Sequence, residues 1–221
     1  MFKAVLKKEW IKTKWFVIGI AVVSLLLHIY MFIKLGRSMR FAGIIHLWDV
    51  VINKEQFVFR EIRFFPIIAG LSIGLSQFIP EIYQKRLKLA LHLPLKSYKI
   101  IFWNIAYGLI CLSTIFIISM SVLLFYISIY FSSEFVESGF FTILPWYLSG
   151  IATYLFVAWI VLEPRWDRRI INSLISLPLI SMFLLDRNPA AYMGSVIMIL
   201  TITILSSSLV YLSVVRFKDG K

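Results

Sequence analysis

Apolar residues along this chain gather into windows that almost exclude charge, each roughly as long as the 18 to 25 residues a helix needs to cross about 30 Å of hydrocarbon. We place the predicted spans at about residues 15–33, 64–79, 105–130, 144–162, 170–185 and 192–215. The fifth is weaker, since Pro178 interrupts it. These runs lack the period-two alternation of barrel strands, and lipid requires every backbone polar group to be paired. The pattern therefore predicts an all-α membrane protein with six transmembrane helices.

Two segments outside the spans are also patterned. Residues 1–14 place apolar side chains at helical spacing and five lysines largely around the other side, which predicts an interfacial amphipathic helix. Simple positive flanking charge for the first span explains the same lysines equally well. Residues 34–63 carry nine charged residues among apolar ones and are too polar to span. We expect them to form an outer loop with one or two short surface helices.

The distribution of charge sets the orientation. Hydrophobic residues make up 60% of the chain, and its formal net charge of +12 has to be interpreted by membrane side rather than as a sign of nucleic-acid binding. Residues 1–14, 80–99, 163–169 and 216–221 hold 16 of the 23 Lys and Arg residues. The positive-inside rule puts these segments on one side, with both termini inside. We expect a multi-pass protein of the cell (inner, or cytoplasmic) membrane.

Motifs for chemistry are missing from the sequence. It has no G-x-x-x-x-G-K-[ST] loop for ATP and no H-E-x-x-H, and its three histidines are far apart. Cys111 lies in an apolar run, and His28 in the outer third of the first span fits a hydrogen-bonded or snorkelling role better than a proton relay. We expect no catalytic, cofactor-binding or metal site in this chain.

Gly70 and Gly74 form a G-x-x-x-G in the second span, flanked by Ser72 and Ser76. Small residues at this spacing let helices approach closely. The motif predicts helix packing, inside one subunit or between two, and lining of a substrate path is the alternative.

Residues 80–99, PEIYQKRLKLALHLPLKSYK, are too long and too patterned for a plain inside turn. Basic residues alternate with leucines, and Pro94 ends any helix before Lys96. Such an amphipathic element could dock in a groove on another protein. An ordinary basic loop lying on anionic lipid is the other interpretation.

The order Glu81, Arg86-Leu87-Lys88 and Leu91-His92-Leu93-Pro94-Leu95, followed by a polar step into an Ile-rich span, resembles the ABC-2 type permeases, the membrane-spanning subunits of ABC exporters. Lys7-Lys8-Glu9-Trp10 is similar to the start of that family, where an amphipathic helix precedes the first span. As topology the resemblance covers nearly the whole chain, and as motif only residues 1–14 and 80–99. The chain departs from the family pattern in its long basic loop 34–63 and in its short connection at 186–191.

The resemblance implies a single transmembrane permease domain over residues 1–221, with a coupling element in 80–99 that touches a cytosolic ATPase. The residues it would place against the ATPase are Glu81, Lys85, Arg86, Leu87, Leu89, Leu91, Leu93 and Pro94. ATP and Mg²⁺ would be bound by that partner, in two copies, and a second permease half, identical or related, would complete the exporter. One alternative is a non-transporting membrane scaffold or assembly protein. A second is an intramembrane enzyme, which is disfavoured because the sequence lacks a cluster of polar catalytic residues.

Overall fold

The computed structural model describes residues 2–54, 59–83, 97–185 and 188–219, and every regular element within them is a helix. The α-helices are α1 (Phe2–Ala42), α2 (Ile44–Ile52), α3 (Phe65–Tyr83), α5 (Ser97–Tyr130), α6 (Ser133–Leu162), α7 (Trp166–Met182) and α8 (Val196–Asp219). Short 3₁₀ helices, η1 (Arg60–Ile62) and η2 (Met193–Ser195), precede α3 and α8. The predicted all-α class is confirmed.

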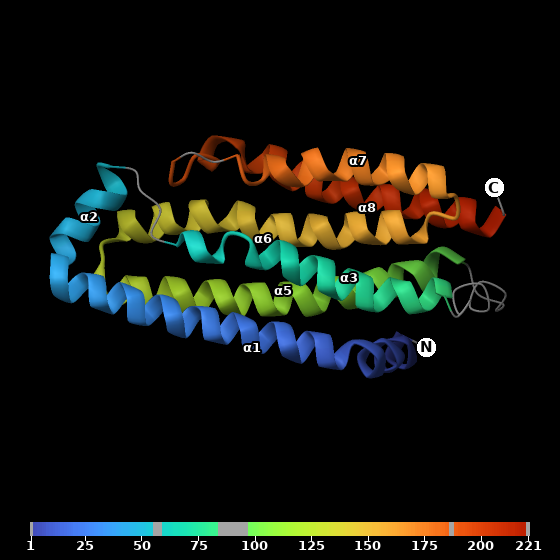
Figure 1. Cartoon of the computed structure of the whole chain (residues 1–221), viewed down its shortest axis with the longest axis horizontal. Coiled ribbons are helices and arrows are strands. Elements are labelled where there is room, and N and C mark those ends of the chain that lie inside the picture. The colour runs from blue at the N-terminus through green and yellow to red at the C-terminus, as the bar shows by residue number, and fades with distance from the viewer. Residues whose placement is uncertain (1, 55–58, 84–96, 186–187, 220–221) are drawn as a thin grey trace.

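The long helices lie side by side along the longest dimension of an elongated bundle, and α2 lies across one end of it (Figure 1). The opposite end holds both termini, the end of α3, the start of α5 and the connection from α6 to α7 (Figure 1). We call this second end the basic end, defined by Lys8, Lys12, Arg165, Arg168, Arg169 and Arg216. The described parts of the segments that the charge count assigns to one side of a membrane therefore meet at one end of the bundle.

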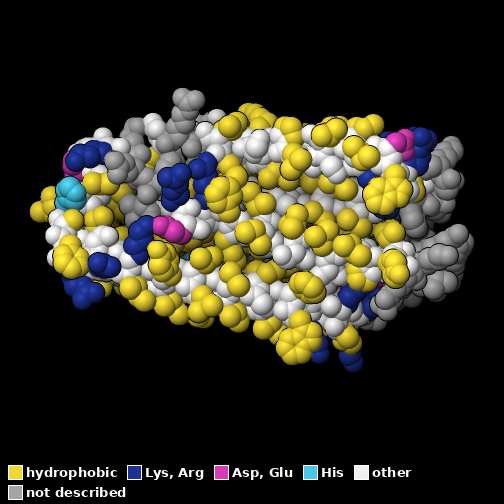
Figure 2. Space-filling view, viewed as in Figure 1, with side chains coloured by type: hydrophobic (Ala, Val, Ile, Leu, Met, Phe, Trp, Pro, Cys, Tyr) yellow, Lys and Arg dark blue, Asp and Glu magenta, His cyan; other side chains and the backbone are white. Residues whose placement is uncertain are grey.

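Within the described residues, four stretches of helix are long and apolar enough to cross a membrane, namely Val5–Ala42, Arg60–Tyr83, Ile101–Tyr130 and Ser133–Leu162. A shorter apolar stretch, Ile197–Ser213, lies in α8. Figure 2 shows apolar side chains covering the middle of one face, with charged side chains gathered toward its two ends. This surface is compatible with a membrane protein, because lipid replaces water around the middle of such a bundle.

Helix α1 is longer than the sequence pattern predicts. It takes in residues 2–14 and 34–42 as well as the first predicted span, so the N-terminal segment is not a separate helix. The first clear break comes at Gly43, whose φ of 81° lies in the left-handed region that favours glycine. After this turn α2 forms one of the short helices expected in residues 34–63. An ion pair from Lys34 to Glu61 holds the extended end of α1 beside η1.

The tightest helix contact joins α3 to α6. A Cβ atom added at Gly70 would overlap the carbonyl oxygen of Gly150, and one added at Gly150 would lie 2.5 Å from the carbonyl oxygen of Pro66. At Gly74 an added Cβ would lie 2.8 Å from Cγ1 of Val157. The G-x-x-x-G of the second span thus packs inside this chain, where the absence of side chains lets two backbones touch.

Buried polar side chains join α5 to its neighbours. The Gln77 side-chain amide donates to the Asn104 carbonyl oxygen at 2.7 Å and accepts a hydrogen bond from the Tyr154 hydroxyl at 2.9 Å. Near the middle of α1, Nδ1 of His28 lies 2.7 Å from the Ser24 carbonyl oxygen and Nε2 lies 3.0 Å from that of Ser119. His28 is therefore hydrogen-bonded across the α1–α5 contact, where an unpaired ring would be costly in lipid.

We predict that Gly70→Ala destabilises the bundle by about 3 kcal/mol or more, because the added methyl group must push two touching backbones apart. Gly19→Ala is the matched control, since a Cβ at Gly19 meets nothing within 4 Å. Thermal unfolding of each purified variant in mild detergent, monitored by size-exclusion chromatography, measures the two unfolding temperatures. Equal unfolding temperatures for the two variants would contradict the close α3–α6 contact.

Candidate functional site

The predicted coupling element lies mostly outside the described residues. Of its eight predicted contact residues the structure describes Glu81, while Lys85, Arg86, Leu87, Leu89, Leu91, Leu93 and Pro94 lie outside the described ranges. Its two flanks are placed, since α3 ends at Tyr83 and α5 begins at Ser97, both at the basic end (Figure 1). The structure therefore shows what the element is attached to.

Glu81 anchors the N-terminal part of α1. Its side chain is 1% exposed, and its Oε1 lies 2.8 Å from Nζ of Lys8 and 2.9 Å from Nζ of Lys12. Lys12 also lies 2.7 Å from Oε2 of Glu9, whose side chain is fully buried. Buried carboxylates require such partners, because their desolvation otherwise opposes folding. The two lysines and two glutamates form one cluster that fixes the start of α1 to the end of α3.

A third buried carboxylate closes the other half of the basic end. Glu163, at the end of α6, is fully buried and accepts a hydrogen bond from the Ser213 hydroxyl at 2.6 Å. Arg216 of α8 lies 3.4 Å from the same oxygen, and Arg168 of α7 lies 3.9 Å from the other one. Glu163 thus ties α6, α7 and α8 together, as Glu81 ties α3 to α1.

The start of α7 also holds an exposed pair, formed by Arg165 just before the helix and Asp167 in its first turn. Arg165 donates to both carboxylate oxygens of Asp167, at 3.1 and 2.7 Å. This hydrogen bonding holds the pKa of Asp167 below its ordinary value. Both side chains are more than half exposed, so the pair orders the turn locally but crosses no helix contact.

Sequence reasoning grouped these charges by membrane side and did not predict their pairing. Lys8 and Lys12 are four residues apart, so they share a helix face. This spacing is the one feature of the sequence that points to their acting together. Nothing in the spacing connects that face to Glu81, which lies 69 residues beyond Lys12. Glu163 directly follows a long apolar run, and its burial depends on α8, which comes about 50 residues later.

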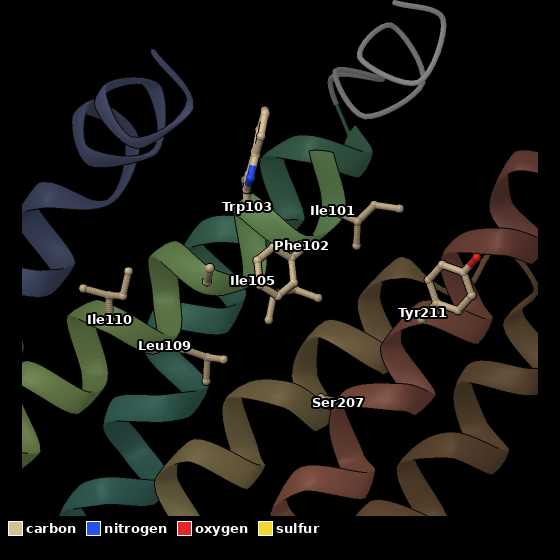
Figure 3. A pocket seen from close by; sticks show the side chains of 9 residues that line it. Ile101, Phe102, Trp103, Ile105, Leu109, Ile110, Ser207 and Tyr211 are labelled. Carbon is tan, nitrogen blue, oxygen red and sulfur yellow. The ribbon is translucent and has the colours of Figure 1, made fainter. Parts of the chain in front are cut away.

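An apolar groove of about 870 Å³ opens between α5 and α8 near the basic end (Figure 3). Figure 3 shows Phe102 of α5 on the side toward Tyr211 of α8. Ser207 supplies a hydroxyl, which already donates to the Ile204 carbonyl oxygen. Within the described ranges, no group of three His, Cys, Asp or Glu side chains could hold a metal ion. The groove could take an apolar chain, and Tyr211 is the one titratable side chain among its described lining residues.

We predict that Glu81→Gln destabilises the chain by about 3 kcal/mol, because it leaves two buried or half-buried lysines with one carboxylate. Adding Lys12→Gln to this variant should recover part of the loss, since it removes the uncompensated charge. Asp167→Asn, in the exposed pair, should leave the unfolding temperature unchanged. Thermal unfolding of the four proteins in detergent tests this, and an Asp167→Asn effect as large as that of Glu81→Gln would contradict the cluster's role.

Comparisons of this chain with protein-family models, with curated proteins and with solved structures gave no match. The likeness to ABC-2 type permeases therefore depends on the residues quoted above. What the structure adds is the arrangement around them, a helical bundle whose basic end is held by two clusters of charged residues, one around Glu9 and Glu81 and one around Glu163.

Proposed function

We propose that this chain is the membrane-spanning permease subunit of an ABC exporter in the cell inner membrane. Its helices α1, α3, α5, α6, α7 and α8 would be the six spans, with both termini inside. ATP would be hydrolysed by separately encoded cytosolic subunits, and a second permease half, identical or related, would complete the translocation path.

The observation that carries this proposal is the place of residues 84–96 between α3 and α5. Their sequence has the leucine-and-lysine pattern of a docking element, and both flanking helix ends lie at the basic end, beside the two termini (Figure 1). The positive-inside rule favours a cytosolic location for that end. A partner that binds this element would meet it on the side where ATP is available.

The Glu81 cluster supports a mechanical role for the element. Glu81 lies three residues before residue 84 and is paired with Lys8 and Lys12 of α1. Farther from the basic end, α3 is in backbone contact with α6 at Gly70. A displacement of the element by an ATPase would therefore act on α1, α3 and α6 together, because rigid packed contacts transmit movement. This is the coupling that an ATP-driven permease requires.

Pull-down of the tagged chain from its native membrane in mild detergent tests the proposal. We expect a P-loop ATPase at equal stoichiometry, with ATP hydrolysis in the eluate. Recovery of the chain alone, or with partners that hydrolyse no ATP, would refute the exporter assignment and favour a membrane scaffold.

We further predict that replacing Arg86, Leu89 and Leu93 together by alanine abolishes ATPase recovery, because it removes one charge and two apolar contacts from the docking element. Membrane insertion should be unaffected. The control replaces Arg37, Phe41 and Ile45 by alanine, an exposed set of the same kind at the opposite end of the bundle. Unchanged ATPase recovery with the first variant would overturn the assignment of this element.

A further inference from the structure

A second groove, of about 530 Å³, lies at the basic end between α3, α6 and α7. We call it the α3–α7 groove. Its walls are apolar and come from all three helices, with Ile79, Ile82, Ile160, Val161, Ile170 and Leu174 among them. Ile170 and Leu174 are 59% and 64% exposed, so this wall lies open on the outside of the bundle. A surface of this kind suits an acyl chain.

One cation lines the same groove. Nε of Arg169 donates to the Glu163 carbonyl oxygen at 2.6 Å, and Nη2 donates to that of Val161 at 3.4 Å. These two bonds use two of the five N–H groups of a guanidinium. Among the described residues the Glu163 carboxylate pairs with Arg168 and Arg216, and no carboxylate lies within ion-pair distance of Arg169. Arg169 is thus oriented by backbone oxygens and forms no ion pair with a described carboxylate.

Two aromatic side chains indicate the level of the membrane at which the groove lies. Trp166 and Tyr83 both line it and are 74% and 87% exposed, and the Arg169 guanidinium lies 5.0 Å from the centre of the Trp166 ring. Exposed Trp and Tyr are typical of the level where headgroups meet hydrocarbon. From Arg169 to Leu174 the helix rises by about 7 Å, toward the middle of the bundle. The groove therefore has a charged, aromatic mouth and an apolar floor, which is the polarity profile of a phospholipid.

We propose that the α3–α7 groove binds an anionic phospholipid of the adjacent leaflet, with its phosphate on Arg169 and one acyl chain along Ile170 and Leu174. A basic pocket between helices at the inner side of a membrane is suited to an anionic headgroup, whereas a zwitterionic headgroup brings no net charge to the guanidinium. The proposal depends on the geometry of this groove and is independent of the transporter assignment.

Native mass spectrometry of the full chain, released from vesicles of equal parts phosphatidylglycerol and phosphatidylcholine, measures the occupancy. We expect the wild-type chain to retain phosphatidylglycerol in preference. Arg169→Gln should lower this preference about fivefold, the contribution of one basic side chain near an anionic surface. Arg165→Gln is the matched control, because Arg165 is paired with Asp167 and does not line the groove. Its preference should remain that of the wild type.

Arg169→Gln also removes the hydrogen bonds that Arg169 donates to Glu163 and Val161, and this variant could fail to fold for that reason. A second variant keeps the proposal testable in that case. Ser173 lines the groove between Arg169 and Leu174, and its hydroxyl donates only to the Arg169 carbonyl oxygen. Ser173→Leu retains the charge and fills the space for the acyl chain. We expect it to reduce phosphatidylglycerol retention while the unfolding temperature in lipid-free detergent stays unchanged.

Three results would overturn the proposal. Equal losses in Arg165→Gln and Arg169→Gln would indicate diffuse surface charge. Displacement of phosphatidylglycerol by inorganic phosphate at equal concentration would indicate an anion site that does not use the acyl chain. A disulfide between two copies of Leu174→Cys in a Cys111→Ser background, formed in native membranes, would show that a second copy of the chain covers the groove.

Discussion

The backbone contact between α3 and α6 is the interaction on which the rest of the bundle depends. In lipid, apolar side chains gain nothing by leaving their surroundings for a neighbouring helix, so close packing must hold the helices together. Gly70, Gly74 and Gly150 permit that packing, and α6 is buried along most of its length as a result. Tyr154, on the same face of α6, then fills the space beside Gly108 and bonds to Gln77, which brings α5 against both helices.

The basic end is organised by buried acids. Glu81 pairs with Lys8 and Lys12 of α1, and Glu163 pairs with Arg168 of α7 and Arg216 of α8, so the positive charge of this end is partly neutralised where the helices meet. Removing either acid would leave two partly buried cations short of a carboxylate, at a cost that pairing now offsets. The ends of α3 and α6, where these acids lie, are therefore each joined to neighbouring helices by charge pairs at the basic end.

Arg169 stands apart from these clusters. Its position is fixed by two carbonyl oxygens at the end of α6, and its charge faces a groove with apolar walls and an aromatic mouth. The connection from α6 to α7 and the first turn of α7 thus contain a buried acid that ties α6 to α7 and α8, an exposed pair, and a cation that lines the α3–α7 groove. These four charged residues lie in three environments, which shows why counting charges by membrane side does not give their roles.

The sequence by itself determined the helical class and the positions of the apolar stretches in α1, α3, α5, α6 and α8, because window length and the exclusion of charge follow directly from the thickness of the hydrocarbon. It also determined which segments gather at one end, through the distribution of Lys and Arg. The sequence pattern did not predict that α1 continues through residues 34–42, because these residues are too polar to count as part of a membrane span. The pairing of Glu81 with Lys8 and Lys12, the burial of Glu163 and the groove beside Arg169 were decided only by the tertiary structure, because each depends on helices that meet across 50 or more residues of chain.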